Sequence, residues 1–411
     1  MLKRNIEIPP VDEDAVNEVP IEEVQLETGT NSEESAHLRA VELADAGGYA
    51  NALERLKDEG LLSGEVGRIQ ETCREALEDA VWMTEADWEM LAVLHCFDEK
   101  TALHCVNTYR IAKAKIEEIT LSGHHMSELV GREGVTLEQF YRACLFHDIG
   151  KCCIPRATLN NTLHDADWDE HLCEEVLENK NATLIEKMRA RLGDLPPIEE
   201  GREGLLAYLK DHHERAMHFV PLASVVGEEE LARIVETFPD IDPREHTLAD
   251  VIAKHEHVSG EILTAVGLDV EGELASQHHN YDHAPLKYPM SGMTLSLSAK
   301  WEELLKLADM TQALSSRRAY KEGWSIPIVC EKLIEEVKRG DVTNILAALW
   351  IKNEFSHMDA SEYGEEDLAA LGRVQQFLDV MEPLLEEAAK EIEQEDASMA
   401  SLAAHDEAVP A

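Results

Sequence analysis

Residues 141–155 read YRACLFHDIGKCCIP and form the most informative segment of the sequence. Their apolar positions predict a helix that ends at His147 and Asp148, and Gly150 is expected to permit a tight turn after it. Adjacent histidine and aspartate side chains at a helix end can bind one or two divalent ions, with the carboxylate as a bridge. Lys151 can then neutralise a phosphate oxygen that faces the ions. A His-Asp dipeptide alone carries no information, whereas HDIGK after an apolar helix indicates a specific metal-dependent site.

Apolar residues recur at helical spacing along most of the chain. Strand signals are weak, because β-branched alternation is rare and no Asn-Gly hairpin turn occurs. The pattern therefore predicts an all-α fold. The expected divisions are a flexible acidic leader (1–36), an N-terminal helical region (37–99), a central domain (100–325) with a helical insertion (about 170–245), C-terminal helices (326–395) and a disordered tail (396–411).

The chain of 411 residues carries 37 Lys and Arg against 83 Asp and Glu, which gives a formal net charge of −46. Such an acidic surface repels a phosphate backbone and an anionic membrane, so we expect no nucleic-acid partner and no membrane partner. The sequence has no apolar run of membrane-helix length and no signal-peptide pattern, and its cysteines show no paired framework. We therefore expect a cytoplasmic protein.

Further segments accompany HDIGK along the chain. They are TALHCVNTYRIA at 101–112, KHEHVSGEIL at 254–263, QHHN at 277–280 and ADMTQALSSRRAYK at 308–321. In this order they resemble the motifs of HD-domain metal-dependent phosphohydrolases, and most closely those of the HD-GYP subgroup of cyclic di-GMP phosphodiesterases. The resemblance covers residues 100–170 and 247–325, and it implies an HD-type helical bundle for the central domain.

The resemblance also implies a centre that binds two divalent metal ions. The implied metal ligands are His104, His147, Asp148, His255, His278, His279 and Asp309. Five imidazoles and two carboxylates suit Fe or Mn, and such a pair of ions would support hydrolysis of a phosphodiester. Asp148 is expected to be essential for catalysis as the shared ligand. Lys151 and Arg318 are expected to bind the non-bridging phosphate oxygens of a small phosphorylated substrate.

The sequence departs from the HD-GYP pattern at several positions. Lys100 stands where three-metal members have a glutamate, which favours two metal ions here. Asn280 replaces the glutamate of the family's HHE motif, and only Tyr288-Pro289 remains of the Gly-Tyr-Pro motif. Gln312 and Ala319 replace an aspartate and a proline. We therefore expect an intact metal core beside eroded features of cyclic di-GMP recognition.

The spacing between motifs is also unusual. His147 and His255 are 108 residues apart, whereas the family joins these motifs through a much shorter segment. Residues 170–245 are therefore interpreted as an insertion that acts as a lid, as a docking element for a protein partner or as a passive decoration. His212-His213-Glu214 within it mimics an HHE motif, but His278 and His279 are preferred because they follow the family's order.

The function expected from these features is a metal-dependent phosphohydrolase, with cyclic di-GMP as the favoured substrate. One alternative is hydrolysis of another nucleotide or phosphoester. A second alternative is a non-hydrolytic signalling or scaffold module built on the HD fold. A buried structural metal site is the least favoured interpretation, because Lys151 and Arg318 would then have no task.

Overall fold

The computed structural model confirms the all-α fold. It describes residues 32–45, 47–130, 134–159, 165–194, 196–211, 215–279, 301–316, 323–339 and 344–407. Within these ranges the only strands are the antiparallel pair β1 (Thr120–Leu121) and β2 (His124–His125). In the same ranges, no helix combines the length and the apolar character needed to cross a membrane.

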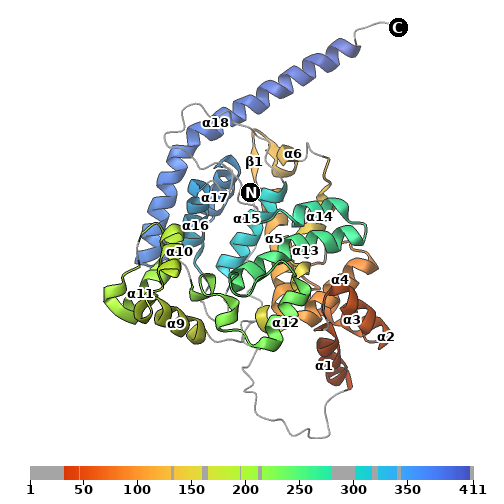
Figure 1. The fold of residues 1–411 in the computed structure, drawn as a ribbon. Helices are drawn as coiled ribbons and strands as arrows, with labels where there is room; N and C mark the ends of the chain where they lie inside the picture. Colours follow the sequence, from red (N-terminus) through yellow and green to blue (C-terminus); the bar gives the residue numbers. More distant parts are fainter. Residues whose placement is uncertain are drawn as a thin grey trace.

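The N-terminal helices pack on one another and on the centre of the molecule (Figure 1). They are α1 (Ser32–Ala44), α2 (Tyr49–Asp58), α3 (Leu62–Thr72) and α4 (Glu85–Phe97). Helix α1 begins inside the leader predicted for residues 1–36, so the helical region starts earlier than expected. Residues 1–31 lie outside the described part of the chain.

The central helices supply the frame of the candidate site. They are α5 (Glu99–Glu118), α6 (Met126–Val130), α7 (Leu137–Phe146), the 3-10 helix η3 (Ile149–Cys153), α8 (Arg156–Leu159), α13 (Leu248–Ala265), α14 (Asp269–Ala275) and α15 (Trp301–Ser315). Helix α5 packs on α7 and α15, and α13 packs on η3 and α14. These contacts bring the motif-bearing segments together.

Short sequence signals fix where several of these helices begin. Thr84, Thr136 and Thr247 each form a capping box, in which the threonine side chain accepts a hydrogen bond from the third residue of the helix and that residue's side chain accepts one from the threonine N–H. Asp98 caps α5 by accepting a hydrogen bond from the N–H of Thr101 at 2.9 Å. Because a cap satisfies backbone donors that the first turn leaves unpaired, these residues set the helix starts.

The segment between α8 and α13 forms its own hydrophobic core. Its elements are α9 (Asp165–Cys173), a π-helical turn (Glu174–Glu178), α10 (Ala182–Leu192), α11 (Gly201–Asp211), α12 (Glu228–Thr237) and 3-10 turns at Ile198–Glu200, Ala216–His218 and Leu222–Ser224. Trp168, Leu172 and Phe219 are buried in this core together with Leu248 and Val251 of α13. The HHE-like residues 212–214 lie outside the described residues.

The C-terminal helices complete the larger core. They are α16 (Ile326–Arg339), α17 (Asn344–Ser356), a 3-10 turn (Ala360–Glu362) and α18 (Glu365–Glu407). Helix α18 packs on α16 and α17, and its C-terminal part projects away from them (Figure 1). The larger core extends from Ala40 in α1 to Ala388 in α18, across the boundaries predicted near residues 100 and 325.

The tail predicted to be disordered from residue 396 is instead helical as far as Glu407. The physical reason is its composition, since Glu, Ala, Met and Leu all have high helix propensity and the segment continues an existing helix.

Candidate metal centre

Seven predicted ligands converge on one buried region. His104 lies on α5, His147 and Asp148 follow the end of α7, His255 lies on α13, His278 and His279 follow α14, and Asp309 lies on α15. Segments more than 200 residues apart in the chain therefore meet at this point, since His104 and Asp309 are in direct contact. The structure thus brings the predicted histidines and aspartates together.

One group of donors is formed by His104, His147 and Asp309. One atom from each of these residues lies within 4.8 Å of the others. The Nε2 atom of His104 is 2.9 Å from Oδ1 of Asp309 and 3.3 Å from Nε2 of His147. His147 is fully buried, whereas 14 % of the His104 side chain is exposed. Three donors at these separations could hold a metal ion.

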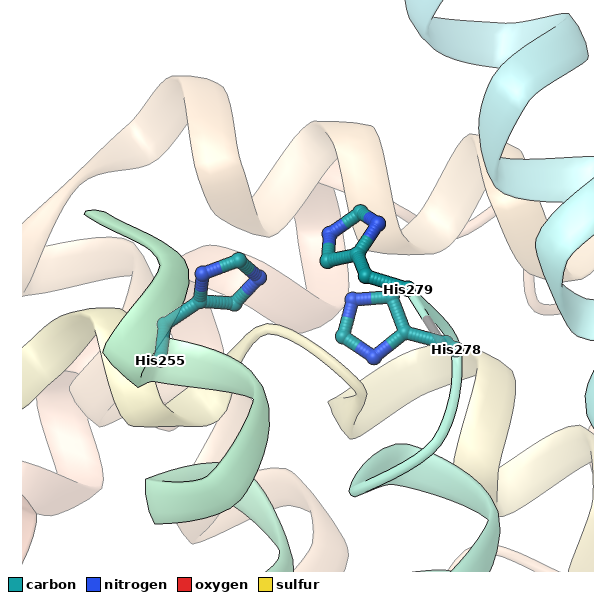
Figure 2. Close-up of side chains that lie close together, drawn as sticks. All are labelled: His255, His278 and His279. Carbon is teal, nitrogen blue, oxygen red and sulfur yellow. The ribbon is translucent and has the colours of Figure 1, made fainter. Parts of the chain in front are cut away.

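A second group is formed by His255, His278 and His279, which also place one donor atom each within 4.8 Å of one another. Figure 2 shows the three imidazoles close together, with His255 on α13 and the histidine pair on the segment after α14. The ring centroids of His278 and His279 are 4.0 Å apart, and those of His255 and His279 are 5.2 Å apart. This group could hold a metal ion as well.

Asp148 lies between the two groups. Its Oδ1 atom is 2.9 Å from Nε2 of His255, and its Oδ2 atom is 3.4 Å from Nε2 of His104 and 3.6 Å from Nε2 of His147. Each carboxylate oxygen thus faces a different group of histidines. Lys151 places its Nζ atom 2.5 Å from Oδ2, so this lysine is paired with Asp148.

Backbone carbonyl groups fix which nitrogen three of the five imidazoles present to the centre. The Nδ1 atoms of His147, His255 and His278 lie 2.9, 2.5 and 2.6 Å from the carbonyl oxygens of Cys144, Ile252 and Ala275. In each case the carbonyl belongs to the residue three positions earlier in the same segment. An Nδ1–H that donates to a carbonyl leaves Nε2 as the metal-binding atom.

Two of these Nε2 atoms test whether the residues fit a metal ion. The Nε2 atoms of His255 and His278 are buried and have no hydrogen-bond partner. The Nε2 atom of His255 lies close to Oδ1 of Asp148, but the two atoms do not form a hydrogen bond. Buried polar nitrogens are nearly always satisfied, and a bound cation would satisfy these two. The donor set therefore fits divalent metal ions.

The two carboxyl groups are held in their ionised forms. Burial would raise the pKa of Asp148, but Lys151, His147 and His255 outweigh burial and keep this pKa well below its usual range. Hydrogen bonds from His104 and His147 do the same for the pKa of Asp309. Both carboxylates are thus available as ligands at neutral pH.

The pKa of His147 is shifted in the opposite direction from those of His278 and His279. Burial, reinforced by neighbouring histidines, lowers the pKa of His278 well below its usual range. Burial is also the main reason why the pKa of His279 falls to about 4. The pKa of His147 is raised, because Asp148 and other neighbours outweigh the effect of burial. Metal binding would therefore displace a proton from His147 but none from His278 or His279.

Gly150 is required for a reason other than the predicted turn. It does not have a positive φ, so any residue could adopt its backbone conformation. A Cβ atom at this position would lie 2.2 Å from the carbonyl oxygen of His255 and 2.6 Å from the backbone N of Ser259. The Gly150 N–H also donates to Oγ of Ser259 at 2.8 Å. The glycine thus lets η3 approach the backbone of α13, which carries His255.

Glycines set the crossing of α13 with α14 in the same way. A Cβ atom on Gly260 would lie 2.9 Å from the carbonyl oxygen of Gly272, and one on Gly272 would lie 2.8 Å from that of Gly260. This close crossing brings the segment that carries His278 and His279 next to His255.

Two residues near the centre were not predicted to contribute. Glu256 accepts a hydrogen bond at 2.8 Å from the backbone N–H of His279, 23 residues away in sequence. Gln312 was identified only as a departure from the family pattern, yet its Oε1 atom contacts Nδ1 of His104. The position of Gln312 on the Asp309 face of its helix was the one available sequence signal, whereas Glu256 had none.

Arg318 lies outside the described residues, as do Asn280 and Tyr288-Pro289. The predicted roles of these residues therefore stay predictions. No family model, no curated protein and no solved structure matches the chain.

Proposed function

We propose that the chain is a metal-dependent phosphohydrolase of the HD type, which uses two divalent ions, Fe or Mn, and has cyclic di-GMP as its favoured substrate. The observation that carries this proposal is the position of Asp148, whose two oxygens face separate groups of histidines. A carboxylate so placed can bridge two ions. When bound, such a pair of ions supplies an activated water nucleophile and stabilises the attacking and leaving oxygens of a phosphodiester.

The donor set favours this metal class. Histidine nitrogens and carboxylate oxygens without a required thiolate suit borderline ions such as Fe and Mn. The position of Lys100 supports two ions rather than three, because its side chain is exposed and lies one helical turn before His104. A lysine there provides no ligand for a third cation.

The exposed side of the centre suggests how substrate would approach. His104 and Lys151 have 14 % and 19 % of their side chains exposed, whereas His147, Asp148 and His255 have 4 % or less. A phosphate that arrives from this side would meet the Lys151 ammonium group. Lys151 could then leave Asp148, bind a phosphate oxygen and offset the negative charge of the phosphate. Arg318 is proposed as the second cation.

A non-hydrolytic signalling or scaffold role is the second candidate. The contact of Gln312 with His104 favours it, because an amide stands where the family has a carboxylate and lowers the negative charge around the first group of donors. A phosphohydrolase for another nucleotide or phosphoester is a further candidate, since the chain departs from the family at positions linked to cyclic di-GMP.

The test is metal analysis of the full chain purified without oxygen, followed by hydrolysis of cyclic di-GMP on the same sample. The proposal expects about two Fe or Mn ions per chain together with turnover. Two ions without turnover of cyclic di-GMP would overturn this substrate and direct the search to other phosphoesters. A protein that binds no metal would overturn the enzyme and leave the scaffold role.

A matched pair of variants tests the site itself. Asp148→Ala should lose both metal and hydrolysis. Asp379→Ala removes an exposed aspartate of α18 and should change neither. If Asp148→Ala retained both metal and hydrolysis, the assignment of the centre would be wrong.

A further inference from the structure

A second cluster of metal-ligand side chains lies among the N-terminal helices, outside the candidate centre. It consists of His37 on α1, Glu65 on α3 and Cys96 on α4, and one atom from each lies within 4.8 Å of the others. The Nδ1 atom of His37 is 2.8 Å from Oε2 of Glu65, and Sγ of Cys96 is 3.5 Å from the same oxygen. Three different helices thus contribute one donor each.

Two of the three side chains in this cluster are buried. Glu65 is 3 % exposed and Cys96 is 1 % exposed, while 26 % of the His37 side chain reaches solvent. A buried carboxylate beside a buried thiol is costly to maintain without a cation. The exposed edge of His37 provides a route by which an ion could enter.

A neighbouring side chain independently indicates a missing ligand. His95 is 6 % exposed, and neither of its ring nitrogens has a hydrogen-bond partner. Its Nε2 atom is 3.8 Å from Glu99, which is too far for a hydrogen bond. The His95 and His37 rings are 6.1 Å apart between centroids, so an imidazole without a hydrogen bond lies beside one of the three donors.

We propose that His37, Glu65 and Cys96 bind a divalent cation of the zinc class, with the fourth position left to a water molecule. Nitrogen, carboxylate oxygen and thiolate sulfur are the three ligand types that zinc accepts in a four-coordinate site. On binding, the Cys96 thiol releases its proton to solvent and the sulfur bonds to the ion. The site would fasten α1, the first described helix, to α3 and α4.

The Arg68 guanidinium group would compete with a metal ion for the Glu65 carboxylate. Its Nε atom is 3.5 Å from Oε2 of Glu65, and 37 % of its side chain is exposed. A cation at Glu65 therefore requires the guanidinium group to turn toward solvent. Without a metal ion, Arg68 and His37 both contact the carboxylate, which is the arrangement expected of a purely structural cluster.

The thiolate provides a spectroscopic test on the full chain. The metal-free protein is titrated with Co²⁺ without oxygen, and the sulfur-to-cobalt charge-transfer absorption is followed. The proposal expects this band to correspond to about one thiolate-bound Co²⁺ per chain, beside the ions that the other centre takes up, and to vanish in Cys96→Ser. Cys330→Ser is the matched control, because Cys330 is a buried thiol of α16 and belongs to no group of possible metal ligands in the described part of the chain. This control should retain the band.

A second variant keeps the test decisive if Cys96→Ser folds poorly. Arg68→Gln removes the competing charge and should tighten Co²⁺ binding by about tenfold, as judged by the same band. The proposal would be overturned by the absence of a thiolate band in the wild-type protein at saturating Co²⁺. It would also be overturned if the band survived Cys96→Ser, or if Arg68→Gln left the affinity unchanged.

Discussion

Substitution of Gly150 by alanine should disrupt the proposed metal centre without removing any ligand. The added Cβ atom would lie 2.2 Å from the carbonyl oxygen of His255, which is 1.2 Å short of the 3.4 Å at which ordinary contact begins. The obstructing atoms belong to the backbone of α13, so no side-chain rotation can relieve the clash. Either η3 or α13 has to move by about 1 Å.

That displacement exceeds what the centre can tolerate. Asp148 directly precedes η3 and His255 lies on α13, so the movement separates two proposed ligands that now approach within 2.9 Å. Metal–ligand distances hold within about 0.2 Å, and a misplacement of about 1 Å at an active site costs on the order of 100-fold in rate. Overpacking should also lower the free energy of unfolding by about 3 kcal/mol.

The assay combines chemical denaturation, metal content and hydrolysis of cyclic di-GMP on one preparation. Gly372→Ala is the control, because Gly372 lies inside α18, is exposed and would place its Cβ atom near no other group. This change should raise the free energy of unfolding by about 0.5–1 kcal/mol, since alanine is the better helix former. Wild-type stability and metal content in Gly150→Ala would refute the close approach of η3 and α13.

Three further outcomes follow from side-chain contacts. Glu256→Ala should weaken metal binding about 10–100-fold in metal titrations, because it removes the acceptor of the hydrogen bond from the His279 backbone N–H. Glu256→Gln keeps an acceptor oxygen, so its metal affinity should stay near that of the wild type. Lowering the pH from about 7.5 to about 5.5 should cost the metal-free protein about 1.3 kcal/mol through His279, because its folded pKa of about 4 lies below its unfolded value and unfolded chains take up the proton first. His279→Gln should lose this contribution and keep that of His278, whose pKa is also lowered, so parallel denaturation curves should show a loss that is smaller by about 1.3 kcal/mol. Arg142→Met should destabilise the protein by about 3–5 kcal/mol, because it leaves the buried carboxylates of Asp87 and Glu271 without their cation. The same change at the exposed Arg373 should shift the denaturation midpoint little.

The residues of the proposed centre could be predicted because each lies in a short motif. HDIGK places His147 and Asp148 at a helix end, and helical spacing places Asp309 on one face of its helix. The all-α fold could be predicted for a similar reason, since apolar periodicity is a local property of the chain. Such patterns require no knowledge of how distant segments pack.

The division of the ligands into two groups could not be predicted. It depends on the crossing of α13 and α14 at Gly260 and Gly272, and on the approach of Gly150 to α13. Glu256 could not be identified for the same reason, because its partner is a backbone N–H that only the fold brings near. These features arise from contacts between backbones, which leave no spacing signal in the sequence.

The cluster of His37, Glu65 and Cys96 was also invisible in the sequence. Its members are 28 and 31 residues apart and fit no metal-binding spacing. Only the packing of α1 on α3 and α4 brings them together. Isolated histidines and cysteines are usually structural, so the sequence alone favoured no role for them.

Helix α13 connects the segment between α8 and α13, which was interpreted as an insertion, to the proposed metal centre. Leu248 and Val251 belong to the core of the insertion, whereas His255 and Ser259 face the centre and η3. These four residues follow one another at helical spacing, so they lie along one face of the helix. A change in the packing of the insertion therefore acts on the helix that carries a proposed ligand. Because α13 also contacts η3 through backbone atoms, it cannot shift without disturbing that contact. The segment between α8 and α13 therefore helps to position His255 and is more than a passive addition to the fold.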